Sequence, residues 1–388
     1  MEPEDRMSAR MPLRQVLLQF CQQAKKVRAD ISAIALTPDA HLWVGSDELT
    51  SIERLSPISP TEYGHHQQFA LGDYVDLPGA GSEIDIEGMD FAEGYLWVVG
   101  SHSTKRKRAK GKNPKDDIRR LLEITTDDNR YLLARIPIVD GVPVKHDPGS
   151  GRFAASLSQS KKGNVVRSEL TQALKDDQHI GPFLKMRVPS KDNGFDIEAI
   201  AVKGHQLFLG LRGPVLRGMA IILEVEVMAE AGGRLTLKRL ANKKRYRKHF
   251  VDLNGLGIRD LCFQGNDLMI LAGATMQLSA PMQLFRFRHA LGHTEDTLWL
   301  QSSARASEAL IKQFDLPWVV GSDNAEGMTL LPCDTPAGNG ADSTKPDKAT
   351  VVKGSQRESE LLVVYDSPSD ERLKQNRAIV ADVFCLSP

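Results

Sequence analysis

Five short segments with one shared pattern recur along the chain, and they constrain its fold more than any other feature of the sequence. Each is a short apolar stretch with an Asp-Ile-Glu-like start, bounded by turn residues, which is typical of a buried strand. The segments are residues 30–36, 85–91, 196–202, 257–263 and 324–330. Internal repetition of this kind indicates a repeat architecture.

Further strands are predicted beside these five segments. Second strands are expected at residues 41–45, 95–100, 206–211, 267–273 and 360–365. Third strands are expected at residues 120–125, 220–227, 283–287 and 378–384, and fourth strands at residues 131–138, 235–240 and 297–301. Repeated units of four strands predict an all-β fold of the β-propeller type.

The number of blades depends on the long interval between residues 85 and 196, which could accommodate another unit. Residues 141–193 contain no Asp-Ile-Glu-like segment, and residues 164–177 have the character of a helix. We therefore predict a five-bladed propeller with a helical insertion at residues 141–193, and six blades are the alternative.

The two ends of the chain are expected to meet in the last blade. The propeller is predicted to span residues 28–388, and residues 1–27 form an N-terminal segment that contributes a ring-closing strand. Residues 14–20 supply this strand beside residues 378–384, which hides two sheet edges. Residues 333–357 are rich in Gly, Pro, Ser and Thr, and we expect a disordered loop there.

Composition excludes several classes of protein. Lys plus Arg and Asp plus Glu both number 50, so a globally basic nucleic-acid binder is excluded, and sequence-specific DNA binding has no supporting motif. No apolar stretch is long enough to span a membrane, and no secretory signal is apparent. Four scattered cysteines suit a reduced, cytoplasmic protein.

Acidic side chains stand where the predicted strands reach one face of the ring. In the usual winding, first strands start and second strands end on this face, around the central channel. Glu87, Glu198 and Glu326 begin first strands, and Asp366 follows a second strand. Oxygen ligands of this type suit calcium or magnesium, which we predict as the cofactor. The alternative is that these glutamates bind backbone N–H groups and hold neighbouring blades together.

Basic residues and one histidine are predicted on the same face. Arg212 and Arg259 could hold an anionic substrate bidentately, with Asp260 beside them, and His102 could act as a general acid or base. Structural pairing of the arginines and a simple strand-end role for His102 are the alternatives. Two basic runs, residues 105–112 and 243–249, would add positive potential there.

Several short motifs resemble one known family. They are Asp-Ile-Glu-Gly at residues 85–88, Gly-Ser-His-Ser at 100–103, Asp-Ile-Glu-Ala at 196–199, Gly-Leu-Arg-Gly-Pro at 210–214, Gly-Ile-Arg-Asp at 257–260 and Ala-Glu-Gly at 325–327. Together they resemble the bacterial domain of unknown function thirty-six-sixteen over residues 28–386, with Ala199 standing where the family tends to have Gly. The resemblance implies a propeller and carries over no activity.

A weaker similarity is to phytase-like esterases and to five-bladed calcium apyrases, whose axial glutamates hold calcium. Glu87, Glu198 and Glu326 match those positions, whereas Ser32 and Arg259 depart from them.

Two functions follow from these residues. The first is a metal-dependent hydrolase acting on an anionic phosphoester, ester or lactone at the axial mouth. The second is a non-enzymatic propeller that recognises an anionic small molecule or an anionic protein surface. The oligomeric state is left open.

Overall fold

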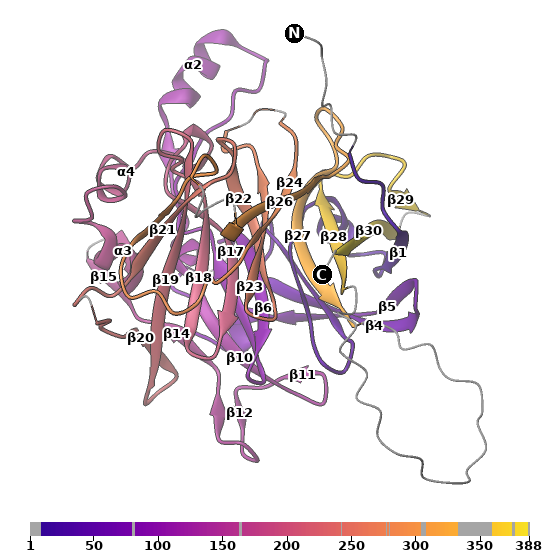
Figure 1. Ribbon diagram of the computed structural model, residues 1–388. Coiled ribbons are helices and arrows are strands. Elements are labelled where there is room, and N and C mark those ends of the chain that lie inside the picture. Colours follow the sequence, from indigo (N-terminus) through magenta and orange to yellow (C-terminus); the bar gives the residue numbers. More distant parts are fainter. Residues whose placement is uncertain are drawn as a thin grey trace.

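The computed structural model consists mainly of strands, and Figure 1 shows the strands from the two ends of the chain, β1, β28 and β30, lying side by side. It describes residues 9–79, 82–162, 165–241, 243–276, 278, 280–303, 308–332, 359–374 and 377–386. The loop predicted at residues 333–357 lies outside the described residues. The fold is all-β and belongs to the propeller type.

Five innermost strands form the centre of the described fold. They are β2 (Ile31–Leu36), β6 (Ile86–Ala92), β17 (Asp196–Lys203), β22 (Gly257–Gln264) and β27 (Asn324–Leu331). In this order each packs beside the next, and β27 packs beside β2, so the set closes on itself. These strands coincide with the five repeated segments.

Antiparallel strands extend outward from each innermost strand. β2 is followed by β3 (Leu42–Ser46), β4 (Ser51–Ser59) and β5 (Glu62–Ala70). β6 is followed by β7 (Tyr95–Gly100), β10 (Leu133–Val139) and β14 (Ala155–Leu157). β17 is followed by β18 (Gln206–Gly213) and β19 (Met219–Glu230), whose two halves pair with β21 (Arg247–Asp252) and β20 (Arg234–Leu237).

The remaining two units follow the same plan. β22 is followed by β23 (Asp267–Gly273), β24 (Gln283–Phe287) and β26 (Leu310–Asp315). β27 is followed by β28 (Ser359–Asp366), β30 (Ala378–Leu386) and then β1 (Arg14–Gln19) from the start of the chain.

Shorter elements connect these units. The short strands are β8 (Lys105–Arg106), β9 (Ile124–Thr125), β11 (Val142–Pro143), β12 (His146–Asp147), β13 (Arg152–Phe153), β15 (Gln159–Lys162), β16 (Val165–Ser168), β25 (Thr297–Trp299) and β29 (Leu373–Lys374). The helices are α1 (Lys25–Ala29), α2 (Pro114–Leu122), α3 (Glu169–Leu174) and α4 (Gly181–Met186), with 3₁₀ turns η1 (Leu71–Asp73), η2 (Asp128–Tyr131) and η3 (Ser190–Asp192).

Every innermost strand carries an irregularity at the same place near its start. The register with the second strand shifts around one residue, which is left opposite no partner, as in a β-bulge. These residues are Ser32, Glu87, Glu198, Arg259 and Glu326. A bulge re-aims its side chain, so the fold places one polar residue from each innermost strand at the same level.

Close approach of β6 and β17 requires a small residue just after the bulge. A Cβ atom on Gly88 would lie 2.8 Å from the backbone nitrogen of Ile200 on β17. Glycine therefore permits β6 and β17 to pack backbone against backbone. Apolar side chains fill the space farther out, as where Met269 and Phe314 meet Tyr365 and Phe384 between the last two units.

The N-terminal strand completes the last unit. β1 pairs antiparallel with β30 from Arg14↔Val383 to Gln19↔Ala378, and its other edge meets β5 in parallel at Leu17↔Glu62. Figure 1 shows β1 beside β30, far from it in sequence. No edge of the last unit is left open between these strands, because β1 has a partner on both sides.

Several predicted elements are wrong in detail. Residues 120–125 are not a third strand, because α2 occupies the first half of that range and β9 pairs only with β8, and residues 131–138 largely form the third strand β10. Residues 297–301 contain β25, which pairs with β21, whereas β26 is the fourth strand of its unit. Residues 141–193 are mainly short strands, and their helices α3 and α4 have six residues each, so the helical insertion is minor.

We predict that packing of β1 supports the whole ring. Leu18 is fully buried, and truncation to Ala should lower the free energy of unfolding by about 2–5 kcal/mol through lost burial and a cavity. Chemical denaturation measures this. The matched control is Leu13→Ala, because Leu13 is 60% exposed and its truncation should change stability by less than about 0.5 kcal/mol. Equal stabilities of the two variants would contradict the closure.

Candidate functional site

A buried chain of ion pairs joins three of the five bulge residues. Arg212, at the end of β18, places Nη1 2.5 Å from Oε1 of Glu198, and Arg259 places Nη1 2.7 Å from Oε2 of the same carboxylate. Arg259 also pairs with Glu326, and Arg212 also pairs with Asp196. Each of these arginine side chains is only 10% exposed. The chain thereby links β17, β22 and β27 across the centre of the ring.

A second arginine group lies at the next unit. Arg130 places Nη2 2.9 Å from Glu83 and Nη1 2.7 Å from Asp85, and it also donates to the hydroxyls of Ser101 and Ser103. Burial disfavours its charge, but Asp85 and Glu83 raise the pKa of Arg130 above its usual value. Arg130 therefore stays charged and neutralises the acids that precede β6.

Other carboxyl groups near the centre have no cationic partner among the described residues. Burial raises the pKa of Glu87 well above its usual value, and repulsion from Glu198 adds to this shift. Burial, followed by repulsion from Asp85 and Asp366, raises the pKa of Asp47 to about 8. Asp47 therefore favours the neutral, protonated form around neutral pH, and the pKa of Glu87 is shifted in the same direction.

The pKa values of carboxyl groups that pair with an arginine are also raised. Burial raises the pKa of Asp196 to about 7 although Arg212 opposes the shift. Burial likewise raises the pKa of Glu326 well above its usual value against the effect of Arg259. Carboxyl groups that titrate near neutral pH are typical of sites that bind ligands or transfer protons.

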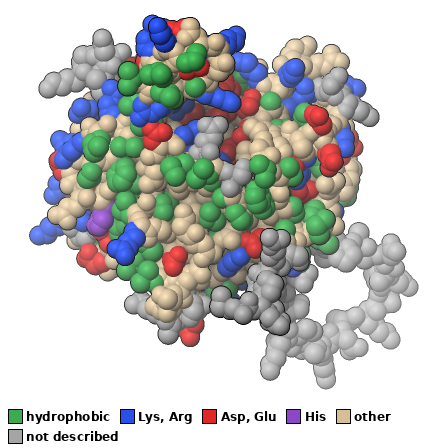
Figure 2. Space-filling model, turned by 90° about the horizontal axis from the view of Figure 1, so that it is seen from above, with side chains coloured by type: hydrophobic (Ala, Val, Ile, Leu, Met, Phe, Trp, Pro, Cys, Tyr) green, Lys and Arg blue, Asp and Glu red, His purple; other side chains and the backbone are tan. Residues whose placement is uncertain are grey.

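A cavity of about 410 Å³, which we call the axial cavity, opens beside this chain of ion pairs. Arg212, Arg259, Glu326 and Asp366 are among the residues that line it. Arg108 and Lys191 add two cations to the lining, and apolar side chains such as Trp318 and Met276 complete it. Figure 2 views the molecule from above, where acidic and basic side chains gather around a central recess.

The predicted site residues do not all reach the axial cavity. Arg212, Arg259, Glu326 and Asp366 line it, and Glu198 lies directly behind them, bound to both arginines. His102 lines a different cavity, described below.

Asp260 has a structural position between two innermost strands. It is buried, and its carboxylate accepts hydrogen bonds from the backbone N–H groups of Leu261 and Met328, at 2.8 and 2.6 Å. Asp260 is absent from the lining of the axial cavity. This contact between β22 and β27 is of the backbone-bound kind that the sequence had suggested for Glu87 and Glu198.

The two basic runs contribute less positive charge than their sequences suggest. In the first run, Lys105, Arg106 and Lys107 pair with carboxylates, whereas Arg108 lines the axial cavity. In the second run, Lys248 is buried 2.6 Å from Asp177, and Arg247 pairs with Glu224. The second run is therefore largely neutralised within the fold.

The residues at the centre do not fit a metal ion in their present arrangement. Among the residues that the structure describes, no group of three or more His, Cys, Asp or Glu side chains is placed to hold one. Glu198 and Glu326 already meet arginine where calcium or magnesium would supply the compensating charge. We therefore derive no chemical step through a metal, and the metal hypothesis is tested below.

Some residues of this centre were not identified from the sequence. Asp85 and Asp196 stand two residues before the bulge, so the Asp-x-Glu spacing of the repeat was the available signal. Arg130 lies in η2, outside any repeated segment, and no local pattern marks it.

Within the described part of the chain, no helix is both long and apolar enough to cross a membrane.

Comparison with known proteins identifies a family and a set of distant structures. A family model described as "Protein of unknown function (DUF3616)" matches residues 30–339 and 333–382. No curated protein matches the chain.

Three similar solved structures are distant from this chain in sequence. A putative oxidoreductase (glucose dehydrogenase) from Thermus thermophilus is 14% identical, with 96% of this chain and 100% of that chain covered and a TM-score of 0.35. Sqt1 from Saccharomyces cerevisiae is 11% identical, with 96% and 99% covered and a TM-score of 0.35. A streptogramin B lyase is 8% identical, with 96% and 98% covered and a TM-score of 0.35.

We predict that Glu198 is essential for stability and that its role is independent of metal. Glu198→Gln leaves two buried arginines short of a charged partner, so the free energy of unfolding should fall by about 3–5 kcal/mol. The loss should be equal with calcium, with magnesium and with a chelator, as measured by denaturant unfolding in each condition. Glu123→Gln is the control, because Glu123 and its partner Lys107 are about 40% exposed and surface pairs contribute about 1 kcal/mol or less. Stabilisation of the wild type by either cation, lost in Glu198→Gln, would support a metal site instead.

We predict a pH dependence that arises from Asp47. Its folded pKa is raised, so the folded state holds the proton more tightly, and stability falls as the pH rises from about 4 towards about 8. Asp47→Asn removes this loss, and its melting temperature should exceed that of the wild type by about 2–4 °C at pH 8 and by less at pH 5. Differential scanning calorimetry measures both values. Asp76→Asn, at an exposed position, is the control, and a gain that is independent of pH would contradict the assignment.

Proposed function

We propose that this chain, which belongs to the DUF3616 family, binds a small anionic ligand in its axial cavity through Arg212 and Arg259. The observation that carries this proposal is the pair of permanently charged guanidinium groups, joined through Glu198, at one cavity wall. Guanidinium groups bind carboxylates and phosphates with a planar pair of donors. The Nε atoms of both arginines have no hydrogen-bond partner among the described residues.

The protonation states of the cavity favour an anion. Burial raises the pKa of Asp366, which moves this lining residue towards its neutral form, whereas Glu326 is paired with Arg259. The arginines stay charged, and Arg108 and Lys191 add positive charge to the lining. The four cations of the lining therefore outnumber its three acids, Asp323, Glu326 and Asp366, although the whole chain has no net charge.

Hydrolysis of the bound anion is the second candidate function. It is favoured by the presence of Glu326 and Asp366 in the same cavity as the arginines. A neutral carboxyl group can protonate a leaving group, and an ionised one can accept a proton from water. A phosphoester, ester or lactone is the substrate class that this arrangement suits, and a recognition propeller without catalysis is the rival.

We infer that the ring has five blades. The inference is supported by the five innermost strands that close on each other and by the similar bulge in each. Residues 141–193 contribute no further innermost strand in the range that is described.

A ligand screen tests the proposed function. Phosphate, pyrophosphate and small carboxylates are tested by calorimetry, and p-nitrophenyl phosphate and simple lactones are tested for turnover. Arg212→Lys keeps the charge but loses the planar pair of donors, so affinity should fall about ten-fold. Arg54→Lys, a buried arginine bound to Gly141 and Gln67 far along the first unit, is the matched control and should leave affinity unchanged.

The same screen separates the two candidate functions. If the protein is a hydrolase, Asp366→Asn should bind its substrate but turn it over at least about 100-fold more slowly. If it is a recognition propeller, no member of the panel is turned over and binding alone responds to Arg212→Lys. The proposal fails if no anion binds, or if Arg212→Lys and Arg54→Lys lower affinity equally.

A further inference from the structure

A second cavity lies between the unit of β6 and the segment that precedes β17. It has a volume of about 400 Å³, and we call it the side cavity. Elements that line it include β16, α3 and α4 from the segment, together with the residues that follow β7. This volume is within the usual range for a small-molecule site.

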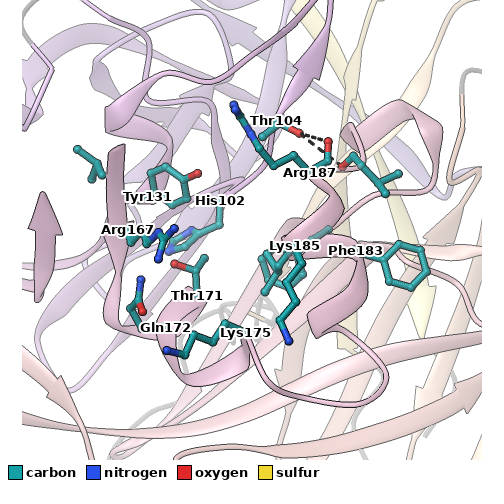
Figure 3. A pocket seen from close by; sticks show the side chains of 14 residues that line it. His102, Thr104, Tyr131, Arg167, Thr171, Gln172, Lys175, Phe183, Lys185 and Arg187 are labelled. Atoms are coloured by element: carbon teal, nitrogen blue, oxygen red, sulfur yellow. Dashed lines mark hydrogen bonds between the residues drawn. The ribbon is translucent and has the colours of Figure 1, made fainter. Parts of the chain in front are cut away.

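The charge of the side cavity is positive. Arg167, Lys175, Lys185 and Arg187 contribute to its lining, and the described lining residues include no Asp or Glu. Asp176 is the neighbouring acid outside the lining, 4.0 Å from Nζ of Lys175 and 3.1 Å from Nζ of Lys185. The two arginines have no such carboxylate among the described residues. Figure 3 shows Lys175 and Lys185 extending to one side of the cavity and Arg187 on the other.

His102 supplies a hydrogen-bond acceptor of defined orientation. Its Nδ1 lies 2.9 Å from the carbonyl oxygen of Gly100, and because a carbonyl can only accept, Nδ1 carries the proton. Burial lowers the pKa of His102 to about 4, so the ring is neutral at pH 7 and Nε2 is a free acceptor. His102 is 2% exposed, and its buried Nε2 has no partner in the part of the chain that the structure describes.

The position of His102 is held by its surroundings. Its backbone N–H donates to the carbonyl of Arg130 at 2.9 Å, and its ring meets Tyr131 edge to face with 5.8 Å between centroids. Its φ of 54° lies in the left-handed region, which few residues other than glycine adopt. A buried polar atom without a partner is costly, so Nε2 is suited to a ligand that donates a hydrogen bond.

We propose that the side cavity binds a hydroxylated organic anion of the sugar phosphate class. The phosphate lies against Arg167 and Arg187, with the two lysines adding charge, and a ligand hydroxyl donates to Nε2 of His102. Thr171 and Gln172 offer further polar contacts, and Val166 and Phe195, which are buried, form an apolar wall for the carbon skeleton. This site is separate from the axial cavity, with which it shares no lining residue.

Calorimetry with ribose 5-phosphate tests the proposal on the full chain. Inorganic phosphate and ribose are the two component probes, and each should bind at least about ten-fold more weakly than ribose 5-phosphate, because each makes only part of the contacts. Arg167→Gln and Arg187→Gln change exposed side chains, and each should weaken binding about ten-fold without changing the melting temperature. His102→Phe keeps an aromatic ring but removes the acceptor. It should reduce affinity for ribose 5-phosphate about ten-fold and leave affinity for inorganic phosphate unchanged.

Two further variants complete the experiment. Arg239→Gln, an exposed arginine outside both cavities, should bind like the wild type. Arg212→Lys changes only the axial cavity. If the Arg212→Lys variant loses binding of ribose 5-phosphate and the Arg187→Gln variant keeps it, the ligand binds in the axial cavity, and this proposal alone is overturned. The proposal is also overturned if ribose 5-phosphate does not bind at millimolar concentration, or if phosphate binds as tightly as the sugar phosphate.

Discussion

The ion-pair chain that runs from Arg212 through Glu198 and Arg259 to Glu326 is the interaction on which the centre of this propeller depends. Charges removed from water are costly unless each meets an opposite charge in good geometry. Glu198 lies within 2.7 Å of two arginines, and Arg259 in turn pairs with Glu326. Displacement of any one of these side chains would therefore leave a buried charge without its counter-charge. Since the members lie on β17, β18, β22 and β27, the chain fixes how these strands are placed around the axis.

The β-bulges make this arrangement possible. In a regular strand, side chains alternate strictly between the two faces of the sheet. The bulge leaves one residue without a partner on the neighbouring strand and turns its side chain in a different direction. The same irregularity recurs at Ser32 and Glu87, although neither joins the ion-pair chain. The β-bulge is therefore common to all five innermost strands. The side chain at each bulge determines whether that unit contributes a charge, a hydroxyl or a neutral acid to the centre.

The two cavities differ in how their charge is held. In the axial cavity, buried arginines and acids of raised pKa compensate one another, so ligand binding there is coupled to stability and to protonation. In the side cavity, the cations are exposed, whereas His102, Thr171 and Phe195 are buried, so the cationic side chains can be changed there without disturbing the core. The paired charges of the axial cavity come from the repeated strands, and Arg108 and Lys191 join them from connecting segments. The side cavity, in contrast, is lined mainly by residues 165–195, which interrupt the repeat.

The sequence by itself determined the repeat, and with it the propeller type. Each innermost strand is buried and therefore needs a short apolar segment, so the same pattern can be recognised in every unit. The bulge residues Glu87, Glu198, Arg259 and Glu326 were identified for the same reason, since they recur at one position of that segment. The outer strand β26 was missed, because it is partly exposed and its pattern resembles that of a connecting segment. The segment of β10 was predicted as a strand but ranked fourth, because residues 120–125 had been assigned as the third strand. Only the tertiary structure decided which charges pair, because Arg212, Arg259 and Arg130 could each reach several acids. It also separated His102 from the axial residues, because positions that are equivalent in the repeat point to different cavities once an inserted segment covers one side of the ring.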